Sequence, residues 1–174
     1  VEGKVVDSQT RQRLGANQRG ELLLRGPGIT PGYWNKPEAT AKAFEDGWLC
    51  TGDIAYFDDD GDYYIVDRSK DMYISGGENV YPAEVENVIF QMEGVAEAAV
   101  IGVHDAKWGE VGKAIVALKP GAQVAAEDVI AHCKARLAGF KAPKHVVFVP
   151  AVARNAAGKL DKPTLRRQFG DAAG

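Results

Sequence analysis

The chain has 174 residues, of which 45% are hydrophobic and 26% are charged, and its formal net charge is −3. This composition predicts a globular protein with one medium domain or two small ones. The sequence has no basic stripe, which argues against nucleic-acid binding, and its longest apolar runs, of about five residues, are far too short to span a membrane. The first residues show no signal peptide, and two widely separated cysteines, Cys50 and Cys133, predict reduced thiols in a cytosolic protein.

Short strands and turns dominate the first 67 residues. Four strands are predicted, at 4–7, 21–25, 52–57 and 62–67. A short helix should begin in Lys36–Thr40, because a proline there suits the first helical turn. Its apolar face should comprise Ala39, Ala43 and Phe44. With a hairpin turn predicted at Asp58–Gly61, these elements form a small antiparallel, β-barrel-like segment.

The pattern changes to mixed α and β structure after Lys70. Strands are predicted at 72–75, 95–103, 111–118 and 146–149, and helices at 82–89, 126–137 and 162–169. Helical spacing should direct Val85, Ile89 and Cys133 toward the core. This order predicts an α+β domain of roughly 100 residues, with a central sheet and packed helices. The segment 68–70 between the two parts is not rich in Gly or Ser, so we expect a tight hinge there rather than a flexible linker.

Two polar residues at strand ends in the first part could bind a nucleotide. Asp53 follows Thr51 and Gly52, where a carboxylate can accept two hydrogen bonds from a ribose diol. Arg68 ends a predicted strand, and its guanidinium fork fits phosphate or ribose oxygens. Each also has a simpler interpretation, because Asp53 could serve only a turn and Arg68 only a surface ion pair.

Two glycine-containing segments in the second part are further candidates. Ser75–Pro82 includes Gly76 and Gly77, which let another backbone or a slim ligand approach closely. The alternative is a plain strand-to-helix turn, and the order of residues is not that of a P-loop. Lys159 follows a glycine on a loop near the end of the sequence, where an ammonium could offset the repulsion between two anions or could simply be solvated.

Five stretches of the chain resemble motifs of the adenylate-forming enzymes, which comprise acyl-CoA synthetases, luciferases and the adenylation domains of peptide synthetases. They are Gly20–Gly28, Pro31–Thr40, Trp48–Asp53, Ser75–Pro82 and Arg154–Lys159. The third looks like the GW-x-x-TGD motif, and the last like R-x-x-x-GK. Asp67 stands before Arg68 where the family pattern commonly has Gly, a variant that resembles fatty-acyl ligases and favours a medium- or long-chain acid.

The resemblance implies a role for each candidate residue. Asp53 and Arg68 would bind ATP or AMP, and Lys70 would be the hinge residue about which a small domain rotates. Lys159 would be catalytic, because it would bind the nucleotide and reach the carboxylate and the α-phosphate during adenylation. The residues expected to contact CoA are Gly76, Gly77, Trp108, Phe140 and Lys144. The last three match more loosely and could equally be ordinary core or surface residues.

The resemblance also divides the chain. Residues 1–67 correspond to the end of a large N-terminal domain, 68–70 to the hinge and 71–174 to a mobile C-terminal domain. The chain is therefore expected to be the last third of an acid–CoA ligase and to be inactive alone. Its implied partners are a carboxylic acid, ATP, CoA and its own N-terminal domain. Mg²⁺ ligands are expected in that domain, and no metal site is expected in this chain, whose three histidines lack ligand spacing.

The implied reaction converts a carboxylate and ATP to acyl-AMP and pyrophosphate, and then transfers the acyl group to CoA. Different faces of the small domain would serve the two steps in turn. Two alternatives stay open: an adenylation domain that loads a carrier protein, and a stand-alone interaction module without catalysis. The resemblance implies a cytoplasmic protein, and peripheral contact with a membrane is compatible with a fatty-acyl ligase.

Overall fold

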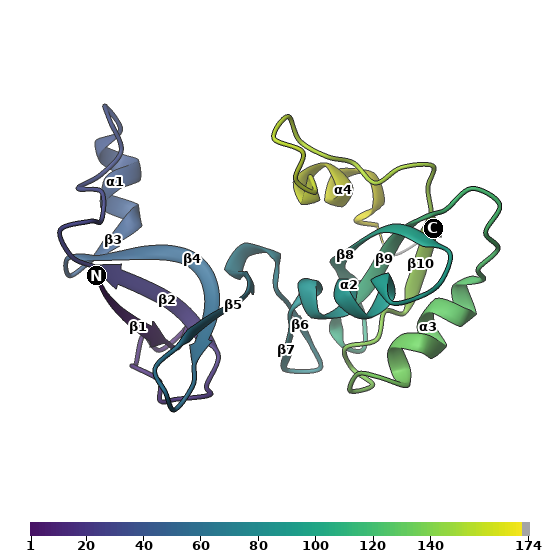
Figure 1. Ribbon diagram of the computed structural model, residues 1–174, viewed down its shortest axis with the longest axis horizontal. Helices are drawn as coiled ribbons and strands as arrows, with labels where there is room; N and C mark the ends of the chain where they lie inside the picture. Colours follow the sequence, from purple (N-terminus) through teal and green to yellow (C-terminus); the bar gives the residue numbers. More distant parts are fainter. Residues whose placement is uncertain (172–174) are drawn as a thin grey trace. The chain divides into compact units, whose positions relative to one another are not determined.

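The computed structural model describes residues 1–171, which form two compact units, Val1–Lys70 and the chain from Asp71 onward (Figure 1). Each unit contains its own, mostly antiparallel sheet, and the helices lie mainly in the second unit. The predicted α+β class is therefore confirmed.

The first unit is built on an antiparallel sheet in the order β1-β2-β4-β3, with β5 paired to β4. Its strands are β1 (Glu2–Val6), β2 (Gly20–Arg25), β3 (Phe44–Glu45), β4 (Trp48–Phe57) and β5 (Tyr63–Arg68). Of residues 1–70, all of which the structure describes, the buried apolar side chains are Val5, Val6, Leu22, Leu23, Ile54 and Ala55. This core is small, and polar contacts hold much of the rest of the sheet.

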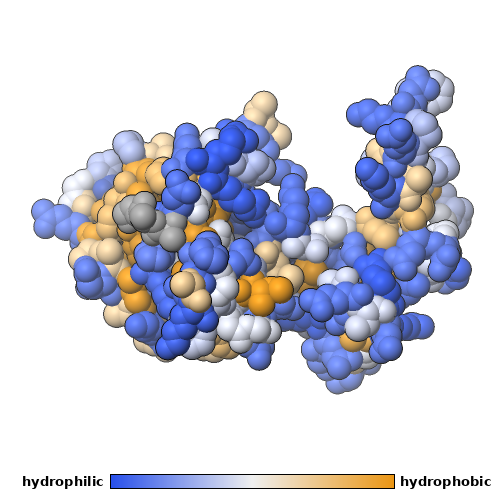
Figure 2. Space-filling model, turned by 180° about the vertical axis from the view of Figure 1, so that it is seen from behind, coloured by the Kyte–Doolittle hydropathy of each residue, from blue (hydrophilic) through white to orange (hydrophobic). Residues whose placement is uncertain are grey.

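Helix α1 (Pro37–Ala43) begins at the predicted proline, but its predicted apolar face is wrong. None of its seven residues, all within the described part of the chain, is buried. Its main contacts are with the short edge strand β3 and with β4, so it projects from the sheet rather than covering it. Figure 2 shows mainly hydrophilic residues on the visible face of the arm that carries α1, and Trp34, just before it, is 89% exposed.

The second unit is arranged around the long strand β9 (Gly109–Leu118). This strand pairs antiparallel with β8 (Val95–Asp105) and with β6 (Tyr73–Ser75), and parallel with β10 (His145–Phe148). Strand β7 (Glu78–Val80) pairs with β6 at the end of the sheet. The helices are α2 (Pro82–Phe90), α3 (Ala126–Lys134) and α4 (Lys162–Phe169), and the one-turn 3-10 helix η1 (Ser69–Asp71) spans the boundary between the two units in the sequence.

Both faces of this sheet are buried. Side chains along β8 and β9 point alternately to one face and to the other, so each strand contributes to both cores. One set, which includes Val100 and Val116, packs with residues of α2 and α3. The other set, which includes Ile101 and Ile115, packs with Leu165 of α4 and with the segment before it. Two-sided burial explains why these strands read as continuous apolar runs in the sequence. The helices therefore lie on both faces of the sheet.

Candidate functional site

The Thr51–Asp53 segment is a bulge in β4. Glu21 of β2 pairs with Ile54, and Leu23 of β2 pairs with Cys50. Between these two pairs β4 has more residues than β2, which is what defines the bulge. Gly52 has a φ of +70°, a conformation that glycine adopts without steric cost. The Thr51 hydroxyl donates to the Leu22 carbonyl at 2.7 Å and accepts from the Asp53 N–H at 3.0 Å, which holds the turn together.

The bulge presents Asp53 to Arg68. The two residues are paired across β4 and β5, and Arg68 Nε lies 2.9 Å from Asp53 Oδ1. Their side chains are 55% and 25% exposed, respectively, so the pair is open to solvent and contributes little to stability. The two predicted nucleotide-binding residues are thus brought together as an accessible carboxylate and guanidinium. The predicted hinge residue, Lys70, is exposed within η1, directly after this pair.

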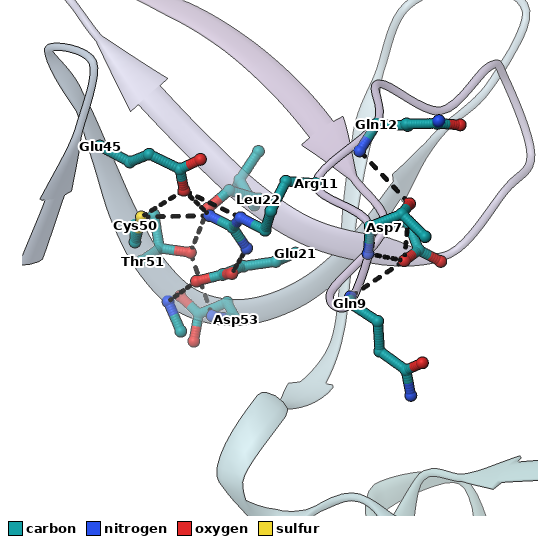
Figure 3. A network of polar contacts seen from close by, with 12 residues as sticks. Asp7, Gln9, Arg11, Gln12, Glu21, Leu22, Glu45, Cys50, Thr51 and Asp53 are labelled. Carbon is teal, nitrogen blue, oxygen red and sulfur yellow. Dashed lines mark hydrogen bonds and ion pairs between the residues drawn. The ribbon is translucent and has the colours of Figure 1, made fainter.

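A charged network that the sequence analysis missed lies beneath the bulge (Figure 3). The Arg11 guanidinium lies between the carboxylates of Glu21 and Glu45, and Glu21 Oε1 accepts from the Gly52 N–H at 3.3 Å. The hydrogen bonds to Glu45 and Glu21 raise the pKa of Arg11 further above its usual value. Glu21 lies in the motif-like stretch Gly20–Gly28, but Arg11 and Glu45 lie in no such stretch. Arg11 precedes Glu21 by ten positions and Glu45 by more, so no local signal pairs them.

Gly76 and Gly77 form the two-residue turn between β6 and β7, where Ser75 pairs with Glu78. Their φ values are +60° and +87°, as a type I′ hairpin turn requires. The alternative of a plain strand-to-helix turn is therefore wrong, because β7 intervenes before α2. An added Cβ would lie 2.8 Å from the Trp108 ring at Gly76, whereas at Gly77 no described residue lies within 4 Å.

The three loosely matched residues line one hollow beside this turn. Trp108, Phe140 and Lys144 surround a cavity of about 170 Å³, completed by Ser75, Val111, Gly139 and Ala142. Trp108 and Phe140 are 38% and 36% exposed as residues, so a ligand can reach them. The structure thus joins residues that are distant in sequence and adds the buried Ser75, which the sequence analysis did not single out.

Lys144 is held over the mouth of this hollow. Its ammonium lies 5.1 Å from the centre of the Trp108 ring and 3.6 Å from an oxygen of Asp105. The Asp105 carboxylate also accepts from the backbone N–H groups of Trp108 and Lys107, both at 2.9 Å. The Trp108 bond, and then those to Lys107 and Lys144, lower the pKa of Asp105, so it is ionised and keeps the cation near the aromatic face.

Lys159 lies on a tight loop before α4. The Asn155 side chain accepts from the backbone N–H groups of Ala157 and Lys159, and Arg154 donates to the Gly158 carbonyl. Arg154 is itself paired with Glu97 of β8 at 2.7 Å, which fixes the loop to the sheet and lowers the pKa of Glu97. In the described chain no ion pair engages the exposed Lys159 side chain, so a rigid loop presents a cation to solvent.

The loop and the glycine turn are at opposite edges of the second unit, as Figure 1 shows for the segment before α4 and for the β6–β7 turn. A single rigid unit thus carries two separate sets of candidate residues. Within residues 1–171, no group of three His, Cys, Asp or Glu side chains is arranged to hold a metal ion. Over the same residues, no helix has the length and apolar character needed to cross a bilayer.

Comparison with known proteins identifies the second unit. Residues 84–159 match the family described as "AMP-binding enzyme C-terminal domain". The chain contains an AMP-binding C-terminal domain. It is 48% identical over 153 residues to a feruloyl-CoA synthase of Amycolatopsis, covering 88% of this chain and 31% of that protein. It is also 50% identical over 150 residues to a long-chain-fatty-acid–CoA ligase of Mycobacterium tuberculosis, covering 86% of this chain and 30% of that protein.

A solved relative extends the similarity beyond the AMP-binding C-terminal domain. The structure of ATP-bound MatB from Rhodopseudomonas palustris matches with a TM-score of 0.90 at 39% identity, over 97% of this chain and 34% of that chain. Both units therefore have counterparts in the structure of that enzyme. The chain spans about a third of the length of the relatives it matches. Its homologues are CoA ligases, and its structural neighbours are adenylate-forming enzymes, in agreement with the resemblance found in the sequence.

Proposed function

We propose that this chain serves as the C-terminal part of an ATP-dependent acid–CoA ligase. The observation that carries the proposal is the hollow bordered by Trp108, Phe140 and Lys144 beside the Gly76–Gly77 turn. An aromatic face can stack on adenine and an ammonium can pair with phosphate, which are the chemical features of the nucleotide end of CoA. The turn lacks side chains at both positions, which suits the passage of the slim pantetheine arm.

The adenylation half-reaction would use the other candidate residues. Asp53 would accept hydrogen bonds from the ribose, and Arg68 would contact the nucleotide oxygens, which fits an exposed carboxylate–guanidinium pair. Lys159 would approach the acid's carboxylate and the α-phosphate and offset the charge that builds between them. An exposed cation on a rigid loop fits this role, because little order would be lost on binding.

Rotation about Lys70 would present the two edges of the second unit in turn. We assign residues 1–67 to the end of a larger N-terminal domain, 68–70 to the hinge and 71–174 to the domain that rotates. The separation of the Lys159 loop from the glycine turn supports this assignment, because one fixed orientation could not bring both to a common site. A carboxylic acid, ATP and CoA would be the substrates. The N-terminal domain would be the partner of this chain and would supply the ligands for Mg²⁺.

We further propose a fatty acid as the carboxylic substrate. The support is the Asp67–Arg68 variant and the Trp34–Pro37 segment in the sequence, together with the similarity to a long-chain-fatty-acid–CoA ligase. The similarity to a feruloyl-CoA synthase at nearly the same identity shows that relatives act on different acids. Acid specificity must then be tested on a protein that contains the acyl pocket.

The test is a chimera in which this chain replaces the matching segment of the long-chain-fatty-acid–CoA ligase. We expect the chimera to release pyrophosphate with an acid and ATP and to form the acyl-CoA when CoA is added. The same host without the segment is the control, and it should form no acyl-CoA. A folded chimera that carries out neither step would contradict the proposal, and one that acylates only a carrier protein would favour the alternative acceptor.

The chain by itself should bind ATP weakly and turn over nothing, because it would lack the acyl pocket. This expectation is measured as pyrophosphate release by the 174-residue chain with ATP and an acid. Detectable release above a no-acid control would show that the chain is a complete catalyst and that its assignment as one part of a ligase is wrong.

A further inference from the structure

The bulge at Thr51–Asp53 depends on a contact from outside its own strand. Glu21, on the neighbouring strand β2, accepts from the Gly52 N–H through Oε1. Gly52 is the residue at positive φ that turns the chain toward Asp53. A carboxylate bonded to this N–H therefore holds the backbone that carries the proposed ribose ligand. Its other oxygen, Oε2, pairs with Arg11.

Arg11 occupies an unfavourable backbone conformation. Its φ is +60°, in the left-handed region that a side chain with a Cβ rarely adopts. Its backbone N–H donates to the Asp7 carbonyl at 3.0 Å, in a turn where Asp7 also accepts from the N–H groups of Gln9 and Thr10. A glycine would satisfy this turn without strain. The arginine side chain must therefore be explained by what it contacts.

The Arg11 side chain joins three elements of the first unit (Figure 3). Its Nε donates to Glu45 of β3 at 2.8 Å, and its guanidinium also pairs with Glu21 of β2. It further donates to the sulfur of Cys50 at 3.4 Å. The Arg11 and Glu21 side chains are only 29% and 13% exposed, so this pair is less screened by water than an ordinary surface pair.

Without Arg11, Glu21 and Glu45 would be two carboxylates on one partly buried site with no cation between them. Two carboxylates that share one guanidinium lie close enough to repel each other once it is removed, and the Glu21 carboxylate would turn away toward water. That movement would release the Gly52 N–H and loosen the bulge. The cation therefore fixes the carboxylate, and the carboxylate fixes the backbone.

We propose that Arg11 and Glu21 are positioning residues that hold the Thr51–Asp53 bulge in the shape needed to bind the nucleotide ribose. The claim about nucleotide binding rests on the proposed function. The claim that Arg11 and Glu21 hold the shape of the bulge does not, and it can be tested by itself. Neither residue would touch the nucleotide. Both would act through Gly52 on the direction of Asp53.

The decisive variant is Arg11→Gly, because it removes the cation and at the same time relieves the backbone strain. The matched control is Asn17→Gly, at another position with positive φ (+63°) outside the network. In the 174-residue chain, ¹⁵N NMR should show the Gly52 amide exchanging about tenfold faster in Arg11→Gly than in the wild type. The melting temperature should change by only a few degrees, and Asn17→Gly should leave the exchange rate of Gly52 unchanged.

The functional arm uses the chimera with the fatty-acid–CoA ligase host. Arg11→Gly should raise the KM for ATP roughly three- to tenfold with little change in kcat, because the lost contact acts equally on bound ATP and on the transition state. Glu21→Ala, which removes the acceptor for the Gly52 N–H, should have a similar effect, and the double variant should be no worse than either single variant, since both break one chain of contacts. Glu21→Ala also serves if Arg11→Gly does not fold.

The two arms separate the possible failures. Unchanged Gly52 exchange in both Arg11→Gly and Glu21→Ala would overturn the positioning claim, whatever the chimera does. Faster exchange with an unchanged KM for ATP would overturn the claim that the bulge shape governs nucleotide binding. An inactive wild-type chimera would count against the proposed function only, because the exchange measurement on the chain alone still decides the role of Arg11 and Glu21.

Discussion

The two units place their candidate residues by different means. In the second unit a sheet buried on both faces fixes the positions of the glycine turn, the hollow and the Lys159 loop. In the first unit six buried apolar side chains support a sheet whose nucleotide-binding bulge is held by charged and hydroxyl groups. Substitutions of core residues should therefore lower the stability of the second unit most, whereas substitutions of polar residues should lower the stability of the first unit most.

The largest effect should come from truncating the core of the second unit. Ile115→Ala removes a fully buried side chain on the central strand β9 and should destabilise this unit by about 3–4 kcal/mol. The matched control, Ile74→Ala on the exposed side of β6, should cost less than about 1 kcal/mol. Urea denaturation followed by NMR signals from each unit would show whether the first unit is spared, and equal destabilisation of both units would break the comparison.

The next largest effect concerns the one ion pair in the described chain whose two partners are both buried polar residues. Lys162 Nζ lies 2.8 Å from Glu86 Oε1, with side chains 9% and 10% exposed, and Glu86 also accepts from the Val100 N–H. Lys162→Met should destabilise by about 3 kcal/mol, because it leaves a buried carboxylate without its cation. Adding Glu86→Gln, which keeps an acceptor for Val100, should restore most of the loss.

The exposed pair Arg25–Glu2 of the first unit is the control for that experiment. Arg25→Met should change the free energy of unfolding by less than about 1 kcal/mol, since exposed pairs are screened. If Lys162→Met costs no more than Arg25→Met, the link between α2 and α4 contributes nothing, and the rigidity assigned to the second unit would need another cause.

A smaller effect should distinguish the two turn glycines. Gly76→Ala should cost about 2 kcal/mol, because it combines a left-handed conformation with a clash against Trp108. Gly77→Ala meets only the conformational cost and should lose about 1 kcal/mol. Thermal unfolding gives the costs, and Trp108 fluorescence should shift for Gly76→Ala alone; identical spectra for the two variants would mean that Gly76 does not support the ring.

The smallest effect should come from removing a tyrosine hydroxyl, which should raise the stability of the second unit and lower that of the first. The Tyr73 hydroxyl, within residues 1–171, is buried without a hydrogen-bond partner, so Tyr73→Phe should stabilise the second unit by about 1 kcal/mol. Tyr63→Phe in the first unit removes a hydroxyl that donates to the Gly3 carbonyl at 2.8 Å and should destabilise by about 0.5–1 kcal/mol. Two changes of the same sign would contradict the contrast drawn between the units.

Most of the fold could be predicted from the sequence, because the long strands and the helices have clear patterns. The runs at 95–103 and 111–118 were predicted as strands and are confirmed within β8 and β9. Strand β7 was missed because its three residues include Glu and Asn, which have little strand preference. The two adjacent glycines before it were the available signal, since such pairs favour two-residue hairpin turns.

The candidate site was only partly predictable. Motif resemblance selected Asp53, Arg68, Gly76, Gly77 and Lys159, and their roles stay predictions. Arg11 lies in no motif, and the Gly20–Gly28 stretch that contains Glu21 does not show its partner, because an ion pair between a turn and a strand depends on how the sheet brings them together. The apolar face predicted for α1 failed for a related reason: helical spacing shows which residues could be buried together, but not whether anything covers them.

The most direct test of the central claim is Lys159→Ala in the chimera, with the two half-reactions measured separately. We expect acyl-AMP formation to fall by at least about a hundredfold, because a charge that stabilises the transition state is removed, while CoA transfer from supplied acyl-AMP is retained. Lys134→Ala, at an exposed lysine of α3, should change neither step. Equal loss of both half-reactions, or of neither, would contradict the assignment of Lys159 to adenylation and of this chain to a ligase that works in two orientations.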